Sequence, residues 1–320
     1  MAQSDAAAVL RADIQTLVLE AAQVDQMFIG LQCMPEWGVQ EKSGQWPKFR
    51  LGKGELLNDD ATRRTPQGSY NLVNRTYEND NYTVEDFGLA ERVDDSYKND
   101  VARFFDAEAQ AALQIRRQVQ IGHESLVAAA MMNASTFNAT AAAVAYTEGN
   151  IATIDLVRDV SGCVSRLNDK GVIPNTIVMS KNVFLRVRRS TLLLNFLRGV
   201  LGNDATRLAT AAQIAQIFAD DGITRCLVGK MPKNSAKKGA AFSSAQVWGD
   251  TYIWVGYCAG GDPMAGGCGR TVVWTKDGPL FTTESWYDTD KRSNMVRVRH
   301  SITAKTVDAT SGELITTSYS

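Results

Sequence analysis

The sequence predicts a mixed α+β fold, and three observations carry that prediction. A long amphipathic helix is predicted over 97–132, helices and strands alternate over 150–260, and a β-rich tail begins at Arg270. A chain of 320 residues has room for about two domains of roughly 100–200 residues each. The pattern therefore indicates an α/β unit accompanied by a long helix and a β-rich tail.

The front of the chain predicts a helix over 4–29. Ser4 or Asp5 would cap this helix, and apolar residues recur at helical spacing from Val9 to Val24. The segment lacks the basic start and the uninterrupted apolar run of a secretory signal, so we expect no such signal.

Residues 44–90 have a different composition, rich in Gly, Pro, Asn, Asp and Thr. Short strand-like pieces lie within this stretch, at 46–51, 70–77 and 82–89. These pieces show no consistent inward face, which predicts a long hairpin or extended loop with little core of its own. Ordering such a loop costs about 1–2 kcal/mol per residue in backbone entropy, so we expect a neighbouring subunit to hold it.

Residues 97–132 give the strongest helical pattern. The apolar residues recur at spacings of three, four or seven, and they are Val101, Phe105, Ala109, Ala112, Ile115, Val119, Leu126 and Ala130. Arg116 and Arg117 are expected mostly on other sides of the helix. A helix of this span would be about 45–50 Å long, and Gly122 is where it would bend or be interrupted.

The α/β unit begins with a helix over 153–170, capped by Thr153 and followed by Gly171. A short buried strand is predicted over 174–179, and Ser180 is expected to cap the next helix, which runs to about Arg189. The remaining elements are a helix over 208–219, a strand over 224–229, and a strand pair or one bent strand over 246–257.

The tail predicts four strands separated by turns. These strands are expected at 271–274, 280–283, 295–302 and 313–317, with turns at 276–279 and 308–312. Val296, Val298, His300 and Ile302 alternate with more polar residues, which is typical of a half-buried strand.

Composition excludes several classes of protein. Hydrophobic residues make up 44% and charged residues 22%, which is typical of a folded globular chain. The net charge of −1 argues against a generally basic nucleic-acid binder, and no apolar run is long enough to cross a membrane. The five cysteines are odd in number and scattered, so we expect free thiols in a reducing compartment.

The cysteine pair Cys258 and Cys268 frames a Gly-rich segment. Zinc needs four ligands, usually in close pairs, and only this one pair with a ten-residue offset is present, so we expect a flexible loop instead. Gly267-Cys-Gly269 within it lacks the glycine pattern of a phosphate cradle and is followed by a strand, so a nucleotide site is not expected.

Other candidate groups have simpler structural interpretations. His123 stands beside Glu124 on the long helix, where adjacent residues do not face each other, so we interpret them as helix surface. The acidic pairs are interpreted as turns and caps; they are Asp59 and Asp60, Asp94 and Asp95, and Asp220 and Asp221.

One local basic segment lies at 229–239. Its lysines Lys230, Lys233, Lys237 and Lys238 could contact phosphate, but no aromatic residues for base stacking lie among them. A solvated loop, or the charged rim of a subunit contact, is the favoured interpretation. The sequence therefore predicts no catalytic residue, no cofactor-binding residue and no metal ligand.

The order of these parts resembles the major capsid proteins of tailed bacteriophages with the HK97-type fold. The most similar stretch is 173–188, with the strand Thr176-Ile-Val-Met-Ser180 followed by a helix that carries Phe184. Segments 215–219, 222–229, 234–236 and 247–250 are similar to the next helix, strand, linker and strand of that family.

The resemblance implies a division of the chain. Residues 1–43 would be an N-terminal arm, 44–90 an extended loop forming a β-hairpin, and 91–150 the peripheral domain with its spine helix. Residues 151–264 would be an α/β axial domain, and 265–320 would return strands to the β-rich peripheral domain.

The resemblance also implies a function. The chain would be a structural subunit, not an enzyme, of an icosahedral phage head that self-assembles into pentamers and hexamers and encloses double-stranded DNA. Its partners would be copies of itself, a separate scaffolding protein, a portal, a decoration protein and packaged DNA without sequence specificity, with no membrane. It would be found in the virion, and in the host cytoplasm during assembly.

Two alternatives remain open at this point. An encapsulin-type nanocompartment shell has the same fold, and neighbouring genes would distinguish it from a phage head. A cytosolic α/β enzyme would instead need a pocket of convergent ionisable groups drawn from Cys258, Cys268, His123 and the lysines at 230–238.

One type of relative cross-links a lysine of the extended loop to an asparagine of the peripheral domain. Lys48 and Lys53 lie in the corresponding region and Asn294 is the candidate partner. We expect this chemistry to be absent here.

Overall fold

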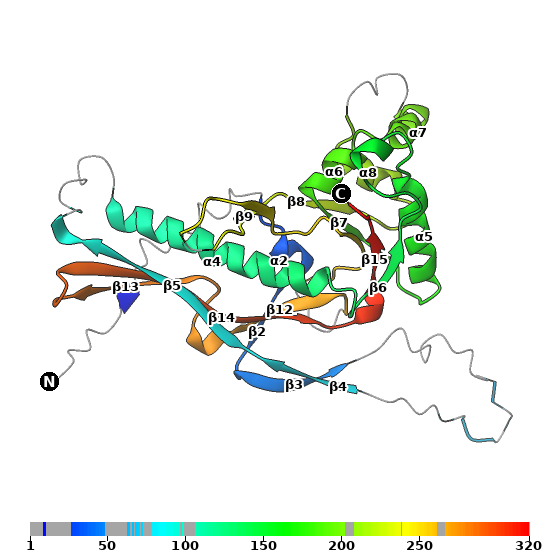
Figure 1. Ribbon diagram of the computed structural model, residues 1–320. Coiled ribbons are helices and arrows are strands. Elements are labelled where there is room, and N and C mark those ends of the chain that lie inside the picture. The colour runs from blue at the N-terminus through cyan, green and yellow to red at the C-terminus, as the bar shows by residue number, and fades with distance from the viewer. Residues whose placement is uncertain are drawn as a thin grey trace.

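The structure is a computed structural model of the chain (Figure 1). It describes residues 9–10, 27–48, 63–64, 66, 68–70, 72, 78–96, 98, 106–201, 208–237, 239–260 and 266–319. Two sheets organise these residues. A six-stranded sheet carries one long helix, and a five-stranded sheet is surrounded by shorter helices.

The six-stranded sheet is built around β14 (Ser293–Thr306), which pairs antiparallel with three other strands. The other strands are β1 (Val9–Leu10), β2 (Glu36–Val39), β5 (Glu85–Asp94), β12 (Gly269–Trp274) and β13 (Thr282–Asp288). Val296, Val298, His300 and Ile302 are buried while Arg297 and Arg299 are not, so the predicted alternation along this strand is confirmed.

Helix α4 (Ala107–Met131) lies across this sheet (Figure 1). Ile115 and Val119 pack against Val298 and Ile302, which fixes the helix on the sheet. The Asp106 carboxylate caps the helix by accepting from the backbone N–H groups of residues 108 and 109.

The predicted helix over 97–132 is confirmed over most of its length, but two details were wrong. Helix α4 starts at Ala107, because Asp106 caps its N-terminus. Its 25 residues span about 37 Å. Residue 98 and the described residues just before it are helical, and most of 97–105 lies outside the described residues. The helix also continues through Gly122 without interruption.

The five-stranded sheet has the order β6-β15-β11-β7-β8. Its strands are β6 (Asn138–Ala141), β7 (Thr176–Ser180), β8 (Arg225–Gly229), β11 (Tyr252–Gly256) and β15 (Gly312–Thr316). Its helices are α5 (Leu156–Asn168), α6 (Lys181–Val187), α7 (Thr191–Leu201) and α8 (Ala211–Ile217). Every residue of β7 is buried, as predicted for a strand covered on both faces.

Several predictions for this unit need correction. Asp155 caps α5 in place of Thr153, because its carboxylate accepts from the Arg158 N–H. Ser180 does cap α6, since its hydroxyl accepts from the Val183 N–H at 3.2 Å. Helix α7 was not predicted. The last strand, β15, pairs with β11 and β6 in this sheet, whereas the division at 265 grouped it with the other tail strands.

The predicted extended loop contains a separate two-stranded hairpin of β3 (Ser43–Lys48) and β4 (Glu78–Thr83), which projects from the body (Figure 1). Its base is better packed than expected: Trp46 and Tyr82 stack with ring centroids 5.5 Å apart, and Trp37 meets Trp46 edge-on at 5.1 Å. The predicted loop ran to residue 90, but its last residues belong to β5, which pairs with β14 in the six-stranded sheet.

Two other expectations for the front of the chain meet the structure only in part. Val9 and Leu10 form a strand with β13 and residues 27–29 are not helical, so the helix over 4–29 was wrong there; the rest lies outside the described residues. Tyr70 and Leu72 are exposed and not in a strand, and most of the predicted strand 70–77 also lies outside the described residues.

The remaining elements are short. They are helix α2 (Gly30–Cys33), strands β9 (Pro232–Asn234) and β10 (Ser244–Gln246), and 3-10 turns at Glu148–Asn150, Thr275–Asp277 and Ala309–Ser311. Within the described ranges, no helix combines the length and the apolar character needed to cross a membrane.

We expect Trp46→Ala to loosen the hairpin and leave the two larger sheets folded. The substitution removes a ring that contacts both Trp37 and Tyr82, and emptying such a site costs about 3 kcal/mol or more. Hydrogen exchange of β3 and β4 should rise by at least tenfold. Leu72→Ala is the control because this side chain is fully exposed; unchanged exchange in Trp46→Ala would contradict the assignment.

Candidate functional site

A buried carboxylate joins the segments that connect the two sheets. Glu124 on α4 accepts hydrogen bonds from the Ile29 N–H at 2.9 Å, the Gly30 N–H at 2.8 Å and the Trp248 indole Nε1–H at 2.7 Å. Burial raises the pKa of Glu124, and the three donors act in the opposite direction. The long helix, α2 and the segment between β10 and β11 therefore meet at one side chain.

Two glycines allow this joint to close. A Cβ atom at Gly30 would lie 2.6 Å from Glu124 Oε2, and a Cβ atom at Gly229 would lie 2.2 Å from the Trp248 ring. Any side chain at either position would therefore push the carboxylate or the indole out of place. The predicted surface position of His123 and Glu124 was wrong, since both are buried.

The two histidines of the chain lie together next to this joint. His123 Nε2 is 3.2 Å from Thr271 Oγ1, and its ring is 6.4 Å from the His300 ring, with Phe281 against both. Burial lowers the pKa of His123 to about 4 and that of His300 to about 3, and the neighbouring His123 contributes to the second shift. Both imidazoles are neutral near pH 7, so they serve as packed aromatic rings there.

Three cysteines lie close together at the end of α2, and Cys33 is the last residue of that helix. The Cys258 and Cys268 sulfurs are 3.7 Å apart, and the Cys268 thiol lies 3.5 Å from the Cys33 carbonyl oxygen. All three are buried free thiols. Contact with Cys258 and burial raise the pKa of Cys268, which makes it a weak nucleophile. In the part of the chain that the structure describes, no three His, Cys, Asp or Glu side chains are arranged for a metal.

The basic segment 229–239 contains one short strand, β9, which pairs with β10 beyond the segment, and its described residues 235–237 lie in the connecting loop. Lys233 lies in β9 opposite Ala245 of β10, while Lys230 and Lys237 are exposed. Lys238 lies outside the described residues. Of the groups named for the enzyme alternative, Lys230 and His123 line one cavity, whereas the buried Cys258 and Cys268 are not among its described lining residues.

The cross-link candidates are separated. Asn294 lies at the start of β14, where its amide donates to the Glu108 carboxylate, which also pairs with Lys98. Lys48 ends β3, in a different sheet from Asn294, and Lys53 lies outside the described residues. Of the acidic pairs, Asp94 accepts from the Ser96 N–H, as expected for a turn, and Asp59 and Asp60 lie outside the described residues.

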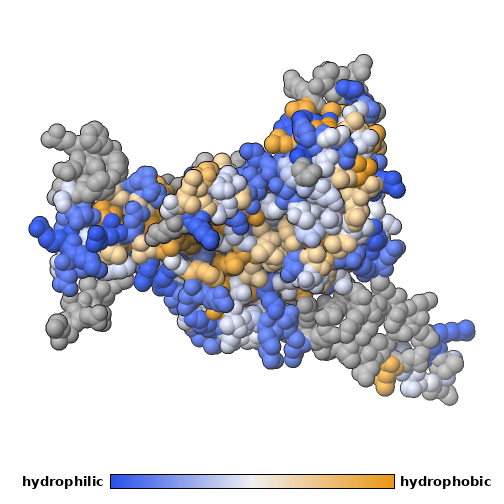
Figure 2. All heavy atoms as spheres, in the orientation of Figure 1, coloured by the Kyte–Doolittle hydropathy of each residue, from blue (hydrophilic) through white to orange (hydrophobic). Residues whose placement is uncertain are grey.

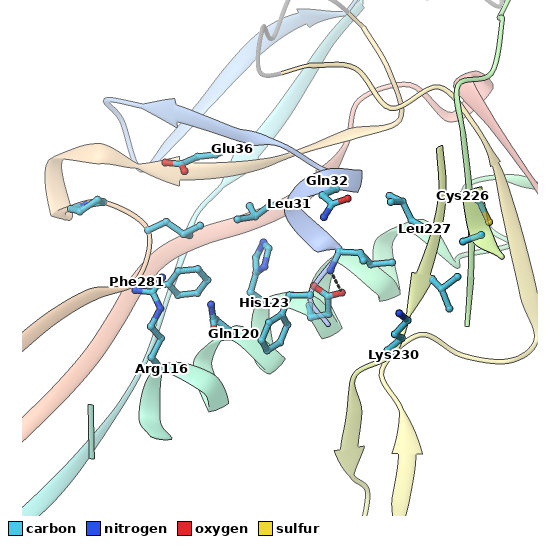
Figure 3. A pocket seen from close by; sticks show the side chains of 17 residues that line it. Leu31, Gln32, Glu36, Arg116, Gln120, His123, Cys226, Leu227, Lys230 and Phe281 are labelled. Atoms are coloured by element: carbon cyan, nitrogen blue, oxygen red, sulfur yellow. Dashed lines mark hydrogen bonds between the residues drawn. The ribbon is translucent and has the colours of Figure 1, made fainter. Parts of the chain in front are cut away.

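The expectation that Arg116 lies away from the packed side of the long helix was wrong. The side chain is 4% exposed and its guanidinium lies 4.7 Å from the Phe281 ring centre, inside a cavity between the two sheets (Figure 3). Its position between Ile115 and Val119, both buried on the sheet side, is the signal that would have placed it on the packed face of α4.

Comparisons with known proteins place this arrangement among solved structures. No protein-family model and no curated protein matches the sequence. A phage-related protein from Bordetella bronchiseptica RB50 is similar, with a TM-score of 0.70, 19% identity and 98% of each chain covered. The capsid of cyanophage P-SCSP1u gives a TM-score of 0.55 at 11% identity, with 90% of this chain and 86% of that chain covered.

A third similar solved structure is a virus-like particle. A virus-like particle from Pyrococcus furiosus gives a TM-score of 0.54 at 9% identity, with 95% of this chain and 96% of that chain covered. Each match extends over nearly the whole chain. The chain therefore has the HK97-type fold, and the predicted fold class is confirmed.

We expect Glu124→Leu to lower the free energy of unfolding by about 3 kcal/mol or more. The substitution leaves three buried N–H donors without an acceptor, and each unpaired donor costs about 1–3 kcal/mol. Guanidinium denaturation would measure the loss. Glu124→Gln keeps one acceptor oxygen and should lose less, and the exposed Glu91→Gln should change little. Wild-type stability in Glu124→Leu would show that the joint is dispensable.

We expect stability to fall as the pH drops from about 6.5 toward 4. The pKa of His123 is lowered from 6.5 to about 4, so the unfolded chain takes up protons in this window before the folded chain does. The contribution of His123, about 3 kcal/mol, is present above pH 6.5 and lost as the pH falls through the window. Denaturation at several pH values would measure it.

The control for this pH dependence is His123→Gln, which cannot titrate. Its stability should vary less than that of the wild type between pH 7 and 4, and the difference between the two chains isolates the histidine from the carboxylates that also titrate there. Identical pH profiles would contradict the assignment.

Proposed function

We propose that the chain is the major capsid subunit of a tailed bacteriophage. The observation that carries the proposal is the match over nearly the whole chain to a phage-related protein and to a phage capsid. A mature capsid of bacteriophage PhiM1 supports it as well, with a TM-score of 0.53, 15% identity and 89% of this chain covered.

The hairpin β3–β4 supports an assembly role. It pairs with no other strand in the described part of the chain, and packing at its base fixes its direction instead of folding it onto the body. Ion pairs reinforce that direction, since Lys305 on β14 lies 3.1 Å from Asp80 on β4. A rigid projection of this kind suits a contact with a second copy.

Copies of the subunit would form pentamers and hexamers through contacts that each bury at least about 1,200 Å². Residues 151–264 would gather around the symmetry axes, and the six-stranded sheet would lie at the capsomer edge. The shell would enclose double-stranded DNA in the virion after assembly in the host cytoplasm. A scaffolding protein, a portal and a decoration protein would be the further partners.

A nanocompartment shell is the alternative function. The likeness to the Pyrococcus furiosus virus-like particle favours it, while the likeness to a phage-related protein at a TM-score of 0.70 and to several phage capsids favours the phage head. Neighbouring genes distinguish the two: portal, terminase and scaffold genes indicate a phage head, and a gene for a ferritin-like or peroxidase cargo indicates a nanocompartment.

The purified chain, expressed with its candidate scaffolding protein, should form closed shells. Negative-stain electron microscopy would show particles of uniform diameter because identical contacts repeat with closed symmetry. The chain expressed alone is the control for the scaffold. Persistent monomers in both preparations under assembly conditions would overturn the proposal.

Assembled shells should dissociate to single chains of 34.9 kDa on a denaturing gel. The reason is that the Asn294 amide is already hydrogen-bonded to the Glu108 carboxylate, which also pairs with Lys98, so the amide is not free to meet a lysine of another copy. A ladder of covalent oligomers that disappears in Asn294→Asp would instead establish a cross-link between copies.

A further inference from the structure

A cavity of about 850 Å³ lies between the two sheets, bordered by α2, α4 and β8 (Figure 3). Most of its lining is apolar, with Phe28, Ile29, Leu31, Leu227, Leu280 and Phe281. Figure 2 shows apolar side chains gathered over the middle of this face of the molecule, between more polar ends. The volume falls in the range of about 300–1,000 Å³ that binds small organic molecules.

Arg116 is a buried cation in this cavity. Arg116 is only 4% exposed, and neither its Nε nor its Nη1 atom has a hydrogen-bond partner. The guanidinium makes a cation–π contact with Phe281, at 4.7 Å from the ring centre. Burial lowers the pKa of Arg116 to about 10, which still leaves it charged near pH 7.

The other charged groups of the lining are already accounted for. Glu124 is held by three N–H donors, and among the described residues no carboxylate forms an ion pair with Arg116, whose Nε and Nη1 have no hydrogen-bond partner. Glu36 and Lys230 are exposed and stand on opposite sides of the cavity (Figure 3). His123 is neutral at pH 7, since burial lowers its pKa to about 4. Arg116 is therefore the one buried charge of the lining that lacks a counter-ion among the described residues.

A carboxylate is the anion that fits this arrangement. A guanidinium binds a carboxylate through two parallel N–H···O bonds, and a single positive charge matches a single negative charge. A phosphate group would bring close to two charges against one buried cation. The apolar walls require that the rest of the ligand be a hydrocarbon chain or ring, since a polar body would lose its hydration there.

We propose that the cavity binds a small monocarboxylate with an apolar body, whose carboxylate pairs with Arg116. Gln120, one turn along α4 and half-buried in the same lining, is positioned to hydrogen-bond the carboxylate beside the guanidinium. The hydrocarbon part then lies against Phe28, Leu31 and Leu227. This binding site does not depend on the proposed assembly function.

Isothermal titration calorimetry of the full chain with decanoate tests the proposal. Decanoate, kept below its micelle concentration, should bind at one site per chain. Decan-1-ol has the same hydrocarbon chain without the charge and should bind at least tenfold more weakly, because a hydrogen bond to a charged group contributes about 1.5–3 kcal/mol.

Two variants locate the site. Arg116→Met removes the charge and keeps the bulk, so decanoate should bind at least tenfold more weakly and no better than decan-1-ol. Leu31→Trp fills the cavity from its half-exposed edge and should abolish binding of both compounds with Arg116 intact. Arg117→Met is the matched control, because this neighbouring arginine is exposed on the other side of the helix and should bind decanoate like the wild type.

Three results would overturn the proposal: no saturable binding of decanoate, equal binding of decanoate and decan-1-ol, or wild-type affinity in Arg116→Met. Circular dichroism would confirm that each variant is folded. If Arg116→Met does not fold, Leu31→Trp and the comparison with decan-1-ol still decide the outcome.

Discussion

The buried carboxylate of Glu124 is the contact on which the relation between the two sheets depends. It stands on α4, which packs on the six-stranded sheet, and it accepts from Trp248, which precedes the central strand of the five-stranded sheet. A buried charge is stable only when its hydrogen bonds are made, so α2, α4 and the Trp248 segment must all be in place together. That requirement fixes the position of the two sheets relative to each other.

Sequence patterns predicted the elements that are governed by local rules. A buried strand was predicted over 174–179 and is found at 176–180. The Ser180 cap and the alternation along β14 follow from capping chemistry and strand periodicity, and both are confirmed. The α+β class and the order of its parts were predicted for the same reason. The resemblance to the HK97-type fold rested on that order and not on any catalytic motif.

The rest depends on long-range contacts that no local pattern reports. Burial of Glu124 depends on donors about 95 and 124 residues away, and β15 finds its partner β6 some 175 residues earlier in the chain. Arg116 looked like helix surface because arginine is usually exposed. Only the fold of Phe281 against α4 shows that it lies inside.

The position of β15 between β11 and β6 also means that the five-stranded sheet is completed last during synthesis of the chain. A ribosome delivers the neighbours of this strand long before residue 312 emerges, so the sheet stays unfinished until then. Polypeptides that stop early leave a gap in the middle of that sheet and expose β11 along one edge. Completion of the five-stranded sheet therefore waits for the last strand of the chain.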